Sequence, residues 1–431
     1  MMSHSCRKIL AAVLASAVLL PFAGCDKKAP VFDMEKGYIE AEDCLVKHSN
    51  TLGGSSFSGE KAVDLSESDS SLSFNYNITS TSHYELDIDY GFSAGGTVSM
   101  FVNGAFYKKI TFPGNGSHVT EIVTLKEGAG EISFKLQTGD SAVVLDKFSL
   151  RKSEHTVSLV VAPHEDDEIL AFAGSIQKAK AAGDDVKVVL LTNGDYFGGD
   201  LGPIRMRESI NALAQVGVED TDVYFLGYGD LILKSIYDSS DPNIVFTAPS
   251  GFDTTFADPS SNVYDYHTLC TGSGAKYSYT NFKVDLYNLI DTLRPDKIYT
   301  TSEAEWHPDH CYTFKIVRDI VESLNSEKNY HTTICSSVIH GEELEWPGRL
   351  DTDASGNPEI VEFTNPFPSG GVALDWGKVT KITLTDEEVL AKKRAIDEYD
   401  TQNYGRENFP GNSTFNYAFC RRDEFYWIYE Y

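Results

Sequence analysis

Two short stretches of the sequence concentrate histidines and carboxylates. The segment PHEDDE, residues 163–168, places one histidine and four carboxylates within six residues, and a later segment, EWHPDH, adds two histidines. His164 and Asp167 are three residues apart. So are His307 and His310, and this spacing brings two side chains to one face of a turn or helix start. Two histidines and one carboxylate, with a fourth position left for water, make a catalytic zinc site; the alternative is a solvated acidic turn at a strand end.

The surrounding elements must bring these two stretches together. Each stretch follows an apolar run that predicts a buried strand, TVSLVVA at 156–162 and KIYTT at 297–301. Strands alternate with helices of ten or more residues, which predicts a parallel sheet covered by helices on both faces. Ligands bind at the carboxyl ends of the strands in such sheets. We therefore expect both clusters at one edge of a Rossmann-like α/β domain, residues 154–431, with residues 231–280 as a long insertion or lid.

The two stretches also carry a resemblance to a known family. APHEDDE resembles the PHPDDE signature of the LmbE-like (PIG-L) deacetylases, and HPDH at 307–310 is similar to the second motif of that family. These are zinc enzymes that remove the acetyl group from N-acetylglucosaminyl compounds. The segments LLTNGD, RESINALAQVGV, FLGYGD and KKRAIDEYDTQ extend the resemblance over residues 155–405.

The resemblance implies a role for each residue of the clusters. His164, Asp167 and His310 would hold the zinc, which polarises the amide carbonyl and lowers the pKa of water to about 7. Asp166 would be the general base that takes a proton from that water and passes it to the leaving amine. A protonated His307 would help to stabilise the oxyanion, a contribution of about 10²-fold or more in rate.

Two neighbours of these residues are also notable. Asp309 is a candidate for orienting a histidine of the site. Glu165 stands where the family has proline, and it either adds an anion near the metal or points to solvent.

Four further residues are candidates for contact with a sugar. Arg207 and Asp230 lie in the matching segments RMRE and LGYGD; the alternatives are a surface ion pair of Arg207 with Glu208 and an ordinary strand-end aspartate. His340 and Trp346 lie in the segment HGEELEWPGR and could face a sugar ring, although for Trp346 we favour packing in the protein.

The segment that precedes the α/β domain has a different pattern. Residues 36–152 consist of short alternating runs separated by turn residues, which predicts an antiparallel sandwich. YIEAEDC and VVLDKFSL resemble the first and last strands of family-6 and family-35 carbohydrate-binding modules, which are jelly rolls. That resemblance makes Glu40, Glu42 and Asp146 candidate ligands of a structural calcium ion. The alternative is a sheet edge with solvated acids.

The N-terminal residues have the composition of an export signal. Arg7 and Lys8 precede an apolar run, and small residues lead to Cys25, so we expect a signal peptide over residues 1–24. The ending AGC resembles a lipobox, which implies lipidation of Cys25, a tether over residues 25–35 and a membrane-anchored, exported protein. Plain secretion is the alternative.

Charge and cysteine content limit the partners and the covalent structure. The chain has 431 residues, with 36 Lys plus Arg against 64 Asp plus Glu, and its formal charge of -28 argues against nucleic-acid binding. Seven cysteines at irregular spacing fit no disulfide framework, although one or two bridges are compatible with export.

The sequence therefore predicts a zinc-dependent N-deacetylase that acts on an N-acetylhexosamine of an extracellular glycan. The alternatives are an amidase for another acyl group and an inactive glycan-binding surface lipoprotein.

Overall fold

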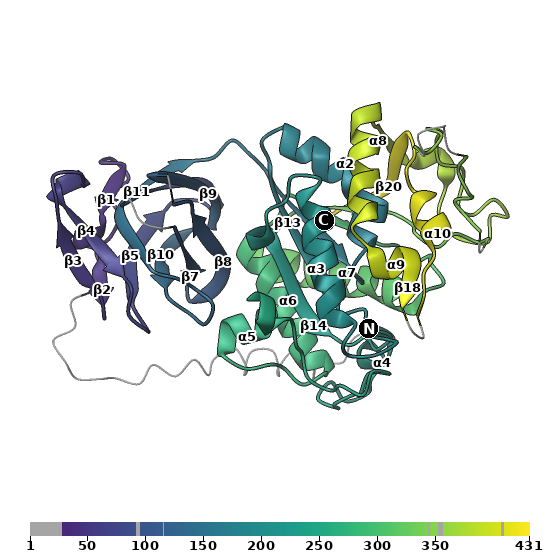
Figure 1. Ribbon diagram of the computed structural model, residues 1–431, viewed down its shortest axis with the longest axis horizontal. Helices are drawn as coiled ribbons and strands as arrows, with labels where there is room; N and C mark the ends of the chain where they lie inside the picture. The colour runs from purple at the N-terminus through teal and green to yellow at the C-terminus, as the bar shows by residue number, and fades with distance from the viewer. Residues whose placement is uncertain (1–27, 92–94, 115, 344, 352–356, 407–408) are drawn as a thin grey trace.

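The protein consists of two domains that lie side by side, a β-sandwich and an α/β domain (Figure 1). This computed structural model describes residues 28–91, 95–114, 116–343, 345–351, 357–406 and 409–431. The predicted signal peptide and Cys25 lie outside the described residues. Within the described ranges, no helix combines the length and apolar character needed to span a bilayer.

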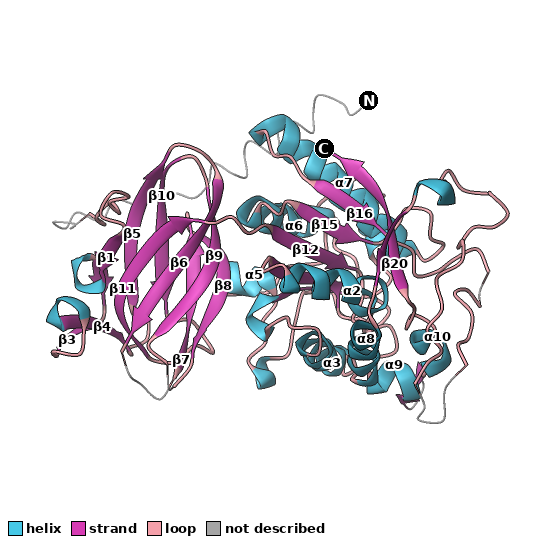
Figure 2. Ribbon diagram, turned by 90° about the horizontal axis from the view of Figure 1, so that it is seen from above, coloured by secondary structure: helices cyan, strands magenta, loops and turns pink. Residues whose placement is uncertain are grey.

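The first domain is built from two antiparallel sheets that face each other (Figure 2). One sheet has the order β3-β4-β11-β6-β9, with β1 also paired to β11, and the other has the order β2-β5-β10-β7-β8. The bounds are β1 Tyr38–Glu40, β2 Leu45–Lys47, β3 Asn50–Gly53, β4 Lys61–Leu65, β5 Ser71–Ile78, β6 Ser82–Tyr90, β7 Gly96–Val102, β8 Ala105–Phe112, β9 His118–Leu125, β10 Gly128–Lys135 and β11 Val143–Lys152. The predicted antiparallel sandwich is confirmed, and the jelly-roll subtype stays a prediction.

Alternation along the strands explains why this segment forms a sandwich. In β6, SHYELDIDY, the side chains of Tyr84, Leu86, Ile88 and Tyr90 are buried, and the residues between them are partly exposed. Successive side chains of a strand point to opposite faces, so this pattern gives one apolar face to pack against the other sheet.

The second domain contains a seven-stranded mixed sheet of order β14-β13-β12-β15-β16-β20-β17. Its strands are β12 Val157–Ala162, β13 Asp185–Thr192, β14 Val223–Tyr228, β15 Lys297–Thr300, β16 Thr333–Ser336, β17 Thr380–Thr383 and β20 Asp423–Glu430. The first five strands of that order are parallel, as predicted, but β20 and β17 pair antiparallel. The expectation of a wholly parallel sheet is therefore wrong, because the chain returns after a long irregular stretch and places β20, antiparallel to both of its neighbours, between β16 and the edge strand β17.

Helices cover both faces of this sheet. They are α2 Asp167–Ala181, α3 Gly202–Ala214, α4 Leu233–Tyr237, α5 Tyr266–Thr271, α6 Tyr279–Leu293, α7 Pro308–Lys328, α8 Asp386–Asp397, α9 Asp400–Tyr404 and α10 Ser413–Tyr417; two short strands, β18 Gly405–Arg406 and β19 Phe409–Pro410, form a separate pair. All six residues of β12 are buried. Leu159 and Val161 pack in one apolar cluster with residues of α6 and α7, whereas Val160 and Ala162 pack in another with residues of α2, α3 and α8. A strand buried on both faces explains the continuous apolar run in the sequence.

The two domains share a buried interface. Lys108 of β8 places its Nζ 2.7 Å from Oδ1 of Asp222 in the α/β domain, and both side chains are almost fully buried. The hydroxyl of Tyr224 donates to the backbone oxygen of Tyr107 at 2.6 Å. The insertion at 231–280 contributes α5, which packs against both β8 and β14 (Figure 1). These contacts fix the sandwich to the α/β domain.

The cysteines form no bridge in the described part of the chain. Cys44, Cys270, Cys311, Cys335 and Cys420 are all free, and the other two cysteines lie outside the described residues. The expectation that one or two bridges are possible is therefore not met by these five.

Candidate metal centre

The candidate centre begins where β12 ends. The chain leaves the strand at Ala162, turns, and starts α2 at Asp167, so that the side chains of His164 and Asp167 meet within one turn. Nδ1 of His164 lies 3.1 Å from Oδ2 of Asp167. The backbone N–H of His164 donates to the same oxygen at 3.1 Å and fixes its position.

The third member comes from the neighbouring strand. His310 lies in the first turn of α7, and its Nε2 is 3.2 Å from Oδ2 of Asp167 and 3.3 Å from Nδ1 of His164. The pairing of β12 with β15 is what brings the two loops together, as the sequence predicts. The three candidate ligand atoms thus form a nearly equilateral triangle.

This triangle fits a zinc ion. Ligands about 2.0–2.1 Å from a tetrahedral zinc lie about 3.3 Å from one another, close to the three separations found here. The donor set of two imidazoles and one carboxylate is also typical of catalytic zinc. His307 belongs to a second grouping, since one ligand atom from each of His164, His307 and His310 lies within 4.8 Å of the others. Its Nδ1 is buried and has no hydrogen-bond partner among the residues that the structure describes.

Buried carboxylates also contact His164 and His310, in each case at the ring nitrogen that is not part of the triangle. Oδ1 of Asp230 and Oδ2 of Asp309 lie 3.2 and 3.4 Å from Nε2 of His164. Asp309 also accepts the backbone N–H groups of residues 231 and 233. Asp230 was expected to touch sugar and Asp309 to orient a histidine; the structure places both of them against His164. Their contacts are those of carboxylates that fix the ring of a metal ligand.

Sequence reasoning missed the corresponding partner of His310. Oε2 of Glu305 lies 2.8 Å from Nδ1 of His310. The same carboxylate accepts the backbone N–H groups of Ile339 and His340, each at 3.0 Å. The one available signal was the general need of a ligating histidine for such a partner, combined with the position of Glu305 in the EWHPDH segment.

The charges around the centre favour a cation. Burial alone would lower the pKa values of His164 and His310, but Asp230 raises the first well above its usual range, and Asp167 raises the second to about 10. Burial would raise the pKa of Asp167, yet His310 lowers it well below its usual range. The carboxylates therefore favour positive charge at the triangle, and a divalent cation supplies that charge when the histidines are neutral.

Asp166 has the position expected of a general base. It lines the same cavity of about 250 Å³ as the triangle. Its φ of 134° is a strained conformation for a residue other than glycine, and such strain clusters at functional sites. Burial and the adjacent Asp167 raise its pKa to about 8. Nη2 of Arg205 stands 3.7 Å from its Oδ2.

Of the two expected places for Glu165, the structure excludes the one in solvent. Its side chain is fully buried, and neither carboxylate oxygen has a hydrogen-bond partner within the part of the chain that the structure describes. Nε of Arg205 is 3.6 Å from Oε2 of Glu165, and Nη2 of Arg205 donates to the backbone oxygen of Glu165 at 2.7 Å. Burial raises the pKa of Glu165 well above its usual range. The residue therefore packs against Arg205 and does not point to solvent.

His307 and His340 complete the cavity lining on the side of α7 and α10. The rings of His164 and His310 lie 4.9 and 4.7 Å from the ring of His307. Burial and the neighbouring His310 lower the pKa of His307 to about 2, which favours a neutral ring without metal; the imidazolium at the oxyanion stays a prediction. His340, a candidate for sugar contact, also lines the cavity.

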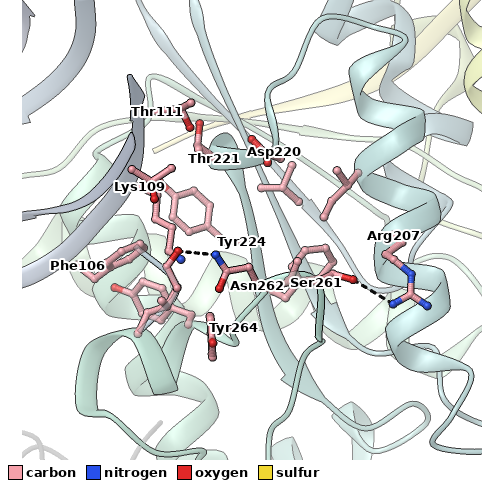
Figure 3. A pocket seen from close by; sticks show the side chains of 18 of the residues that line it. Phe106, Lys109, Thr111, Arg207, Asp220, Thr221, Tyr224, Ser261, Asn262 and Tyr264 are labelled. Carbon is pink, nitrogen blue, oxygen red and sulfur yellow. Dashed lines mark hydrogen bonds between the residues drawn. The ribbon is translucent and has the colours of Figure 1, made fainter. Parts of the chain in front are cut away.

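Two other sugar-contact candidates lie elsewhere. Arg207 lines a separate cavity of about 320 Å³ between the domains, where it donates to the hydroxyl of Ser261 at 3.3 Å (Figure 3), and it also forms an ion pair with Asp258. Trp346 is buried in the core against Phe363, Phe419 and Phe425, so the interpretation as a packing residue is confirmed. No histidine is among the described residues that line the interdomain cavity. The histidines that could bind a metal line the smaller cavity of about 250 Å³.

The remaining residues of the motif serve as anchors. Oε1 of Glu168 accepts the hydroxyls of Ser209 and Tyr399, each at 2.6 Å, and so joins α2 to α3 and to the segment before α9. Oε1 of Glu208 accepts the backbone N–H of Thr401 at 2.9 Å. These buried bonds bring together segments that lie far apart in the sequence.

The predicted calcium ligands also lie close to one another. The hydroxyl and backbone N–H of Ser58 donate to Oε1 of Glu40 at 2.9 Å and to Oδ2 of Asp146 at 3.1 Å. Three oxygens are buried and have no hydrogen-bond partner in the described ranges: Oε2 of Glu40, Oε2 of Glu42 and Oδ1 of Asp146. Burial raises the pKa values of Glu42 and Asp146, and the charge of Glu40 adds to both shifts. These unpaired oxygens favour a cation.

Comparison with known proteins agrees with this geometry. Residues 159–321 match the family PIG-L, described as GlcNAc-PI de-N-acetylase. The PIG-L segment runs from β12 into α7 and contains His164, Asp167 and His310. It supports an amide hydrolase of the de-N-acetylase type. No curated protein matches the chain.

Solved structures match smaller parts of the chain. An exo-beta-1,3-galactanase from Phanerochaete chrysosporium is 26% identical over 26% of this chain and 29% of its own, with a TM-score of 0.23. A family 35 carbohydrate binding module from Clostridium thermocellum is 18% identical over 27% of this chain and 98% of its own, with a TM-score of 0.24. A cycloalternan-forming enzyme from Listeria monocytogenes is 21% identical over 26% of this chain and 12% of its own, with a TM-score of 0.25. The chain thus spans less than a third of the length of the galactanase.

Proposed function

We propose that the protein is a zinc-dependent hydrolase that removes the N-acetyl group from an N-acetylhexosamine residue of an extracellular glycan. The observation that carries the proposal is the triangle of ligand atoms of His164, Asp167 and His310 beside Asp166. The PIG-L match of the same segment supports the amide as the bond that is cleaved.

The zinc ligands and Asp166 have different roles in the proposed reaction. Zinc held by His164, Asp167 and His310 would polarise the amide carbonyl and lower the pKa of water from about 15.7 to about 7. Asp166 takes a proton from the attacking water, whose oxygen bonds to the carbonyl carbon, and gives that proton to the leaving nitrogen. The carbon–nitrogen bond then breaks and leaves acetate and a free amine on the sugar.

His307 stabilises the negative charge that develops on the carbonyl oxygen. Its lowered pKa favours a neutral ring, and its Nδ1 lacks a hydrogen-bond partner among the described residues. In the tautomer with hydrogen on the nitrogen that faces the substrate, the ring donates to the oxyanion without requiring a proton from solvent. Loss of such a donor typically lowers the rate by about 10²-fold or more.

Acetate release tests this function directly. We expect the protein to release acetate from an N-acetylglucosamine oligosaccharide panel, with about one zinc per chain. Asp166→Asn keeps the size of the side chain but removes the base, so activity should fall by about 10²- to 10⁴-fold while the zinc content stays. Zinc without acetate release from any member of the panel would contradict the proposed bond cleavage, and amides with other acyl groups would be tried next.

We also propose two accessory features. Glu40, Glu42 and Asp146 hold a structural calcium ion in the sandwich, supported by their unpaired buried oxygens. Export and a lipid anchor on Cys25 stay predictions from the sequence, and they would place the enzyme at a membrane that faces its glycan.

A further inference from the structure

Trp306 stands at the edge of the metal cavity with its side chain largely in solvent. It directly precedes His307, and 57% of its surface is exposed. Its ring centroid lies 4.8 Å from that of His340 and 5.9 Å from that of His307. Isolated exposed aromatic residues are ordinary. Trp306 differs from them because both of its ring neighbours line the cavity.

The contacts continue from Trp306 into the cavity as a row of rings. His340 stacks on Phe415 of α10 with centroids 5.5 Å apart and ring planes 14° apart. Phe415 lines the cavity together with His340 and His307. An aromatic wall defined by Trp306, His340 and Phe415 therefore runs from solvent to the interior of the site.

The size of the cavity limits what it can enclose. Its volume of about 250 Å³ lies below the 300–1,000 Å³ typical of pockets for drug-sized ligands. A cavity below this range does not enclose a whole oligosaccharide. In a longer substrate, the neighbouring sugar lies at the mouth, where Trp306 is the exposed end of the aromatic wall.

We propose that Trp306 is the platform on which the sugar ring next to the reacting residue stacks, so that the preferred substrate is an oligosaccharide and not a free monosaccharide. The inference rests on the proposed function and adds the substrate class. One face of a pyranose ring presents C–H groups and packs on an aromatic surface, while its hydroxyl groups point outward to water. Tryptophan offers the largest such surface at a low entropic cost, since only two side-chain torsions are fixed.

Binding measurements in a background without turnover test the platform separately from catalysis. In the Asp166→Asn protein, calorimetry compares triacetylchitotriose with N-acetylglucosamine. We expect the trisaccharide to bind about tenfold more tightly, a difference of about 1.4 kcal/mol. Adding Trp306→Ala should remove this preference and leave the monosaccharide affinity unchanged, whereas Trp306→Phe should retain most of it.

The outcomes distinguish the platform from the proposed function. An unchanged trisaccharide preference in the Trp306→Ala variant, or no trisaccharide binding at all, would overturn the platform. In the protein with Trp306 present, trisaccharide should also shift the tryptophan emission, and the Trp306→Phe variant should lack that shift. This second measurement holds even if Trp306→Ala disturbs folding. If the preference depends on Trp306 but the unmutated protein releases no acetate, the platform stands and the proposed reaction fails.

Discussion

Replacing Glu305 by glutamine should weaken zinc binding although Glu305 is not a predicted zinc ligand. Its carboxylate holds three buried groups, the Nδ1 of His310 at 2.8 Å and the backbone N–H groups of Ile339 and His340 at 3.0 Å. A glutamine of the same size presents one oxygen and one NH₂ group, so a donor must face a donor at one position. A hydrogen bond to a charged group contributes about 1.5–3 kcal/mol.

The effect on the metal follows from the orientation of His310. When Nδ1 of His310 donates to Glu305, its Nε2 carries a lone pair for the metal. Loss of this partner typically lowers metal affinity about 10- to 100-fold. Competition with a chromophoric chelator measures the zinc affinity, and acetate release should fall in parallel at limiting zinc.

A matched control lies two residues away. Glu303 is exposed and pairs with Arg318 at the surface, so Glu303→Gln should leave the zinc affinity unchanged. A thermal melt confirms that each variant is folded. If folded Glu305→Gln protein binds zinc as tightly as the unmutated protein, the argument that Glu305 fixes His310 is refuted.

The remaining predictions concern other parts of the molecule. Arg205→Ala should lower acetate release by about tenfold or more because Arg205 holds the backbone at Glu165, whereas Arg207→Ala, in the interdomain cavity, should leave it unchanged. Asp222→Asn removes a charged partner from the buried Lys108 and Lys187, so urea denaturation should show a free energy of unfolding lower by about 3 kcal/mol. The control, Asp220→Asn at an exposed position, should change that free energy little. Burial would raise the pKa of Asp222, but its lysine partners lower it, so this stabilisation is complete above pH about 3.9 and is lost only as the pH falls further. Calcium should raise the melting temperature, and Asp146→Asn should abolish that rise without changing zinc content.

Much of the α/β domain could be predicted from the sequence. The predicted strand at 156–162 is β12, which begins one residue later, because a strand buried on both faces needs apolar residues at most positions. The rule that ligands gather at the carboxyl ends of parallel strands was sufficient to join the loop before α2 to the loop before α7. The mixed sheet could not be foreseen, because the direction of β17 and β20 depends on how a long irregular stretch returns.

The spacing of buried residues in α3 indicates which of its two arginines faces the site. Residues two positions apart on an α-helix are rotated by about 200° around the helix axis, so Arg205 and Arg207 of α3 must point to nearly opposite sides. Arg205, Glu208, Ser209 and Ala212 share the spacing of one buried stripe, and all four are buried. This spacing was visible in the sequence and favours Arg205 over Arg207 as the residue that faces the site.

Other parts of the site depend on tertiary contacts that leave little trace in the sequence. The role of Glu305 requires that its carboxylate meets the N–H groups of two residues about 35 positions later. The lowered pKa of His307 follows from its burial beside two other histidines. The lining of the cavity by α10 follows from packing of the C-terminal helices, which no motif specifies.

The zinc content of the unmutated protein and of two histidine variants tests the central claim most directly. After zinc loading and removal of free metal, elemental analysis should find about one zinc per chain in the unmutated protein. His310→Ala should bind none under the same conditions, and His331→Ala, at an exposed histidine outside the cavity, should bind as much as the unmutated protein. Equal zinc in all three proteins, or none in any, would contradict a metal centre built on His164, Asp167 and His310.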